Sequence, residues 1–122
     1  MNEDRWLDLF SGNYVAEPDF ITENGQTIGF DHTCFEDWIY VSNQDGTYSE
    51  LSEDFGVNNA GCTLAMAATD YDRNGHVDLM VINDFGQWVI PNPLYQFVGS
   101  EDQMQDVGPE TGADVGIYGM GV

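Results

Sequence analysis

One short segment carries most of the chemistry that the sequence offers. Residues 70–79 read Asp-Tyr-Asp-Arg-Asn-Gly-His-Val-Asp-Leu, so oxygen-bearing side chains recur at alternate positions of a turn-forming stretch. Asp70, Asp72 and Asn74 would each present an oxygen to the inside of a loop, and Asp78 would close the set from the start of the next strand. Calcium is a hard cation that takes roughly six to eight oxygen ligands. The spacing therefore predicts a calcium-binding loop.

Two residues between these side chains complete the predicted site. Gly75 permits the sharp turn that a β-carbon would obstruct. His76 would contribute its main-chain carbonyl, so its imidazole need not be a ligand. Magnesium is less favoured, because it requires a smaller octahedral shell and retains waters. The predicted metal ligands are therefore Asp70, Asp72, Asn74, His76 and Asp78.

Two other interpretations fit part of this segment. An EF-hand loop begins in the same way, but it needs a bidentate glutamate at its twelfth position and helices on both sides. The twelfth position here is Val81, inside an apolar run. The remaining alternative is a solvated turn rich in aspartate and asparagine that binds no ion.

The charge of the chain limits its partners. The chain has 22 acidic residues and only two basic ones, Arg5 and Arg73, so its formal net charge is −20. Such a surface repels nucleic acid and anionic lipid, whereas it attracts divalent cations and cationic partners. Adaptation to salty water is an alternative origin of the same composition. The sequence has no apolar run long enough for a membrane span and no basic or apolar signal region at its start.

The elements that must position the loop are expected to be strands. Short apolar, β-branched and aromatic runs alternate with clusters of Gly, Asn and Asp, and no stretch has convincing helical periodicity. Both faces of the run 77–83 are largely apolar, so this strand should be covered on both sides. The predicted strands are 6–14, 37–42, 47–51, 62–69, 77–83, 87–90, 94–98 and, more weakly, 103–107.

The chain also repeats itself. Residues 6–10 match 76–80, and Asn13 then matches Asn83. The N-terminal copy lacks the first ligand and has Arg5 at the place of the turn glycine, so we do not expect it to hold an ion. The first repeat also has excess length at 15–36, which indicates an insertion between strands.

At these residues the sequence resembles the FG-GAP/VCBS repeat family, found in integrin α-subunit propellers and bacterial secreted proteins, and in particular the repeats that accompany ASPIC/UnbV domains. The first half of the repeat unit is matched by 65–83, the second half by 39–48 and, more weakly, by 93–96. The ending 118–122 is similar to the strand that leads into another calcium loop.

The resemblance implies an all-β fold: a β-propeller segment of about two four-stranded antiparallel blades, with calcium loops between the first and second strands of a blade. Residues 1–57 would form a partial blade with the insertion 15–36, residues 58–107 a complete blade, and residues 108–122 the start of the next. The chain would be part of a larger propeller; otherwise its blade edges must be completed by neighbouring copies.

These features lead to an extracellular or cell-surface calcium-binding module for adhesion or protein interaction, with the periplasm as an alternative compartment. Its partner would be a protein or carbohydrate that the sequence does not identify. A second hypothesis is a structural subunit that self-assembles through blade edges. A third is part of a propeller enzyme acting on polysaccharide, although the charge of −20 argues against an acidic polysaccharide. No catalytic residues and no cofactor besides Ca²⁺ are predicted.

Several other residues could do chemistry, and each has a simpler interpretation. We expect the acidic pairs to be solvated, the histidines to be structural or surface residues, and the tryptophans to pack between blades rather than to line a carbohydrate-binding surface. The two cysteines fit either one disulfide or two free thiols. These residues are Glu53-Asp54 and Glu101-Asp102; His32 and His76; Trp6, Trp38 and Trp88; Cys34 and Cys62.

Overall fold

The computed structural model describes residues 2–99 and 103–121 and is all-β apart from one short helix. The acidic pair Glu101-Asp102 and the terminal residues Met1 and Val122 lie outside the described residues. The elements are β1 (Leu9–Ser11), β2 (Val15–Glu23), β3 (Gln26–Cys34), β4 (Trp38–Ser42), β5 (Tyr48–Glu50), β6 (Thr63–Thr69), β7 (Asp78–Asn83), β8 (Leu94–Phe97), β9 (Met104–Asp106) and α1 (Gly108–Thr111).

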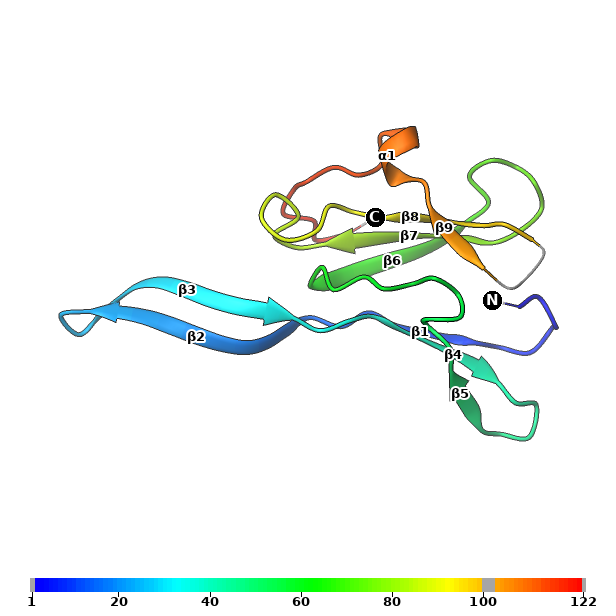
Figure 1. Cartoon of the computed structure of the whole chain (residues 1–122), viewed down its shortest axis with the longest axis horizontal. Coiled ribbons are helices and arrows are strands. Elements are labelled where there is room, and N and C mark those ends of the chain that lie inside the picture. The colour runs from blue at the N-terminus through cyan, green and yellow to red at the C-terminus, as the bar shows by residue number, and fades with distance from the viewer. Residues whose placement is uncertain (1, 100–102, 122) are drawn as a thin grey trace.

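Every sheet is antiparallel. Strands β6, β7, β8 and β9 form a four-stranded sheet in chain order, and β1, β4 and β5 form a three-stranded one. Strands β2 and β3 pair only with each other, as a long hairpin that extends away from the two larger sheets (Figure 1). The hairpin is therefore inserted in the chain between β1 and β4, which still pair directly with each other.

The core lies between the two larger sheets. It combines side chains from β4, β7, β8 and β9 with two residues of the loop that follows β5. Strand β7 is almost wholly buried, which confirms the prediction that both of its faces are covered. The buried residues of this core are Ile39, Val41, Phe55, Val57, Leu79, Val81, Tyr95, Phe97 and Met104.

A buried polar cluster joins the two sheets beside this core. The Asp37 carboxylate accepts hydrogen bonds from Asn59 Nδ2 at 2.5 Å, from Thr63 Oγ1 at 2.6 Å and from the Asn13 amide at 2.7 Å. Asn59 and Asn83 are also hydrogen-bonded to each other through their side-chain amides. Each of these polar groups therefore has a partner, as burial requires.

Three expectations about the elements were wrong. The run 87–90 is a turn in which the Phe85 carbonyl accepts hydrogen bonds from the amides of Trp88 and Val89. The stretch 15–36 contains two nine-residue strands that the sequence pattern did not predict. Helix α1 was also missed, because its four residues are too few to show a helical period. Among the described residues, no helix has the length and apolar character that a membrane span requires.

Candidate metal centre

The predicted ligands lie on the connection between β6 and β7. Thr69 and Asp78 are paired across these strands, so Asp70 follows the last pair and the loop 70–77 closes the hairpin. This topology returns Asp78 to the start of the loop even though it is eight residues further along the chain. The sheet thus brings together two carboxylates that the sequence separates.

Three carboxylates converge in this loop. Ligand oxygens of Asp70, Asp72 and Asp78 all lie within 4.8 Å of one another. Asp70 and Asp72 are exposed, whereas Asp78 is fully buried. Like charges at this separation repel one another, and burial of one of them strengthens the repulsion. A cation between the carboxylates would remove this cost.

The backbone is turned so that amides and side-chain oxygens point inward together. The amides of Asn74 and Gly75 donate to Asp70 at 2.9 and 3.1 Å, and the Asn74 amide also donates to Asp72 at 3.0 Å. The His76 amide donates to Asn74 Oδ1 at 2.8 Å. Gly75 has φ +90°, and a β-carbon there would meet nothing within 4 Å. Glycine is therefore favoured for its dihedral angle and not for space.

Asp78 anchors the loop to the sheet. One of its oxygens accepts the Tyr71 amide at 3.1 Å, and the other accepts the Phe97 amide of β8 at 3.0 Å. Strand β8 also reaches the loop through Gln96, whose Nε2 donates to Asp72 at 2.6 Å. A carboxylate oxygen has two lone pairs, so each Asp78 oxygen retains one for a metal.

The imidazole of His76 does not belong to the cluster. Its Nδ1 lies 2.9 Å from the Glu3 carboxylate, and its ring lies 5.3 Å from the ring of Phe97. The imidazole is thus engaged with Glu3, and a contribution of the His76 main chain to a metal stays a prediction. Sequence reasoning missed Glu3, since a partner 73 residues away leaves no local signal.

The donor set and its size fit calcium. All the side-chain donors are hard oxygens, and calcium–oxygen distances of about 2.3–2.6 Å place opposite ligands up to about 5 Å apart. The three carboxylates present oxygens within 4.8 Å of one another, so one ion with these bond lengths can reach all three. Magnesium is less favoured, because it requires a smaller octahedral shell and retains waters.

The N-terminal copy of the loop has the same conformation. Glu3 and Arg5 have φ +59° and +74°, close to the +61° and +90° of Arg73 and Gly75. Asp8 accepts the Ser42 amide at 3.0 Å, as Asp78 accepts the Phe97 amide. The exchange of glycine for arginine therefore keeps the positive φ at this position, and the absence of an ion from this copy stays a prediction.

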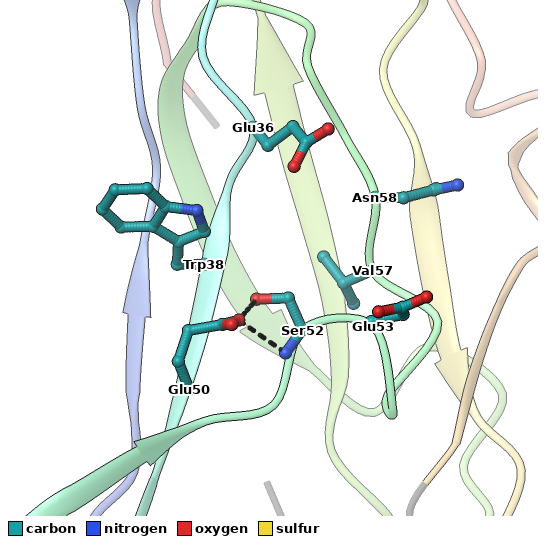
Figure 2. Close-up of a pocket in the computed structure, with 7 residues that line it drawn as sticks. All are labelled: Glu36, Trp38, Glu50, Ser52, Glu53, Val57 and Asn58. Carbon is teal, nitrogen blue, oxygen red and sulfur yellow. Dashed lines mark hydrogen bonds between the residues drawn. The ribbon is translucent and has the colours of Figure 1, made fainter.

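A second group of acids lines a hollow of about 430 Å³ beside β4 and β5. Figure 2 shows Trp38 and Glu50 on one side and Val57 and Glu53 on the other. Hydrogen bonds from the Ser52 hydroxyl and amide lower the pKa of Glu50, so this carboxylate is ionised near neutral pH. A general acid needs the opposite shift. The remaining lining residues are Glu36, Ser52 and Asn58.

The structure also shows the bonding, position or exposure of the other candidate residues that it describes. Cys34 and Cys62 form a disulfide, which closes the choice between a bridge and free thiols. His32 lies against Phe85, with ring centroids 4.4 Å apart, whereas His76 lies in the loop after β6, so the two histidines form no common site. The packing expected of the tryptophans is wrong within this chain: Trp6, Trp38 and Trp88 are 53%, 41% and 65% exposed.

Comparison of the chain with protein-family models, with curated proteins and with solved structures found no match.

Proposed function

We propose that this chain is a calcium-binding segment of an extracellular β-propeller and that it serves adhesion or protein interaction. The observation that carries the proposal is the convergence of Asp70, Asp72 and Asp78 within 4.8 Å. The spacing of these residues in the sequence points to the same ion independently of the coordinates.

Four side chains and one carbonyl would hold the ion: Asp70, Asp72, Asn74 and Asp78, with the main chain of His76. A bound calcium would neutralise the three carboxylates. Because Asp78 is also hydrogen-bonded to β8, the loop would then be fixed to three neighbouring strands of one sheet. The consequence is a rigid edge from which neighbouring loops can contact a partner.

The propeller part of the proposal is supported by contacts that recur between successive sheets. The Thr63 amide at the start of β6 donates to the Asn13 carbonyl at 2.8 Å. The Gly119 amide donates to the Asn83 carbonyl at 3.2 Å, and Asn83 is the counterpart of Asn13 in the sequence repeat. The segment around Gly119 thus meets the sheet of β6–β9 as β6 meets the sheet of β1, β4 and β5. A regular succession of such units is what a propeller requires.

The extracellular part is supported by the Cys34–Cys62 disulfide, since such bonds persist in oxidising compartments. A role in binding rather than catalysis is supported by the acidic hollow beside β4. Its Glu50 has a lowered pKa, and no histidine lines it. The net charge of −20 favours a cationic partner surface.

The test is a pair of thermal melts, in excess calcium and in chelator, of the wild type and of Asp72→Asn. A ligand that binds only the native state stabilises it by about 2.7 kcal/mol at about 100 times its dissociation constant. For a domain of this size, that free energy raises Tm by on the order of 10 °C. The wild type should show this rise, and Asp72→Asn should lose most of it.

Asp54→Asn is the matched control, because it removes one exposed carboxylate from a turn outside the loop. It should keep the full calcium response. A wild-type melt that does not respond to calcium, or an equal loss of response in both variants, would overturn the proposed site.

A further inference from the structure

A second hollow, of about 390 Å³, lies at the junction of three chain segments. These segments are the end of β3, the turn that follows β7 and the segment around residue 118. The hollow lies outside the candidate metal loop and shares no residue with it. Its lining consists of Asp31, His32, Phe85, Trp88, Val89 and Tyr118.

Aromatic rings form most of this lining, and they are tilted against one another. The ring of Tyr118 is edge-on to Phe85 at 5.9 Å and 79°, and to Trp88 at 5.2 Å and 61°. His32 lies 4.4 Å from Phe85 at 50°. Because the rings are tilted and not stacked in parallel, their faces point in several directions around the hollow. Trp88 and Tyr118 nevertheless remain 65% and 56% exposed, so packing within the chain does not account for them.

The walls of the hollow are held in place by the backbone. The Gly86 amide donates to the Ile117 carbonyl at 3.2 Å, and a β-carbon on Gly116 would lie 3.1 Å from the Gly86 carbonyl oxygen. This close approach sets Tyr118 beside the turn that carries Phe85 and Trp88. The disulfide of Cys34 fixes the end of β3 to the chain just before β6. A ligand would therefore meet a largely preformed site, which lowers the entropic cost of binding.

The surroundings of the hollow are negative. Asp31 lines it directly, and Asp84, which is buried, precedes Phe85 and accepts a hydrogen bond from the Tyr14 hydroxyl at 2.8 Å. The two arginines of the chain lie in the loops before β1 and β7, and there is no lysine. The aromatic faces add the negative side of their quadrupoles. Charge complementarity thus selects a cation.

We propose that this hollow binds a small molecule with a quaternary ammonium group, of the choline type, through cation–π contacts with Trp88 and Tyr118. Such a group has no N–H to satisfy, which suits a lining of several rings and one carboxylate. A primary ammonium would need several acceptors at the same place. The proposal is independent of the calcium site.

The experiment follows the indole N–H resonances of the nitrogen-labelled chain in excess calcium at fixed salt. Choline is titrated against the neutral alcohol in which a tert-butyl group replaces the trimethylammonium group. The Trp88 resonance should shift saturably with choline, and the alcohol should bind at least about tenfold more weakly, a difference of about 1.4 kcal/mol. Trp6 and Trp38 serve as internal references, because both are exposed elsewhere in the chain.

Variants separate the site from general attraction of cations to an acidic chain. Choline affinity of the variants is measured by titration calorimetry, because Trp88→Ala has no Trp88 resonance to follow. Trp88→Ala and Tyr118→Ala change exposed side chains and should each weaken choline binding by about tenfold. Trp38→Ala removes an indole beside the acidic hollow and should leave choline binding unchanged. Asp31→Asn should weaken binding, whereas Glu23→Gln, an equal change of charge at the hairpin tip, should not.

The proposal is overturned if the neutral alcohol matches choline or if the Trp88 resonance does not respond to choline. It is also overturned if a neutral pyranoside, and not choline, shifts that resonance saturably. The rings would then form a platform for sugar binding. Equal losses of choline affinity in Trp38→Ala and Trp88→Ala would identify unspecific attraction and would reject the site as well. Melting curves of each variant establish that the chain is folded.

Discussion

At the scale of single residues, the three carboxylates of the loop have different tasks. Asp72 is exposed and lies on the loop, whereas Asp78 is buried and accepts two main-chain amides. We expect Asp78→Asn to lower the free energy of unfolding in chelator by about 1–3 kcal/mol, because the amide nitrogen would face one of these donors. Asp72→Asn should change it by at most about 0.5 kcal/mol. Urea unfolding without calcium measures both, and equal effects would contradict this division of tasks.

Asp37 gives a second prediction at this scale. Burial raises the pKa of its carboxyl above the ordinary value, although hydrogen bonds from Thr63, Asn13 and Asn59 oppose the rise. The unfolded chain therefore loses this proton at a lower pH than the native chain does. The contribution of Asp37 to stability is then full below the ordinary pKa and is lost as the pH rises through the raised pKa.

The free energy of unfolding of the wild type minus that of Asp37→Asn should accordingly fall as the pH rises from about 4 to about 7. Groups with lowered pKa, such as Asp45 and Glu50, change in the opposite direction, but both proteins contain them and they cancel in the difference. Urea unfolding at several pH values measures it. A difference that increases with pH would show that the hydrogen bonds outweigh burial.

The sequence was informative where neighbours along the chain determine the chemistry. The carboxylates that converge in the loop could be identified because alternate positions of one turn carry oxygens and because Gly75 provides φ +90°. The Asp37 cluster could not be predicted, since Asn59, Thr63 and Asn83 reach it from three other segments. Arg5 has φ +74°, a left-handed angle that a residue with a β-carbon rarely adopts, so its conformation could not be read from its type.

At the scale of elements, periodicity worked for strands that bury one or two faces and failed for those that bury neither. Strands β2 and β3 form a two-stranded ribbon that is mostly exposed, so no apolar alternation marks them. Their turn is formed by Asn24-Gly25, which has φ +51° and +78° as a tight hairpin requires. The run 87–90 was misleading because its apolar residues are in a turn, where Trp88 and Val89 line a hollow instead of joining a sheet.

The disulfide gives a prediction for the hairpin. Cys34 and Cys62 are 28 residues apart, and closing a loop of this size in the unfolded chain is worth roughly 3–4 kcal/mol. We expect the double variant Cys34→Ser/Cys62→Ser to lose about this free energy of unfolding in urea. The wild type under reducing conditions is the control and should lose as much. The calcium response should persist, since the bridge and the loop lie at opposite ends of β6. If the free energy of unfolding did not change, the hairpin would be held in place by contacts other than the bridge.

At the scale of the whole molecule, the net charge of −20 acts on stability through self-repulsion. Salt should weaken this repulsion, because the screening length falls from about 10 Å at 0.1 M to about 3 Å at 1 M. We therefore expect Tm to rise smoothly with sodium chloride. The rise should be the same in Asp72→Asn and in the wild type, because one charge in the loop changes the overall field little.

The effect of calcium on Tm should differ from that of salt screening, because calcium acts at one loop. At matched ionic strength, calcium should raise the Tm of the wild type beyond the value in sodium chloride, and magnesium should do so much less, because magnesium requires a near-octahedral shell and dehydrates reluctantly. Asp72→Asn should retain the response to salt and lose the extra response to calcium. If magnesium equals calcium, or if the variant keeps the whole calcium effect, then divalent ions act on this chain only through its overall charge, and the convergence of the three carboxylates is a property of the turn alone.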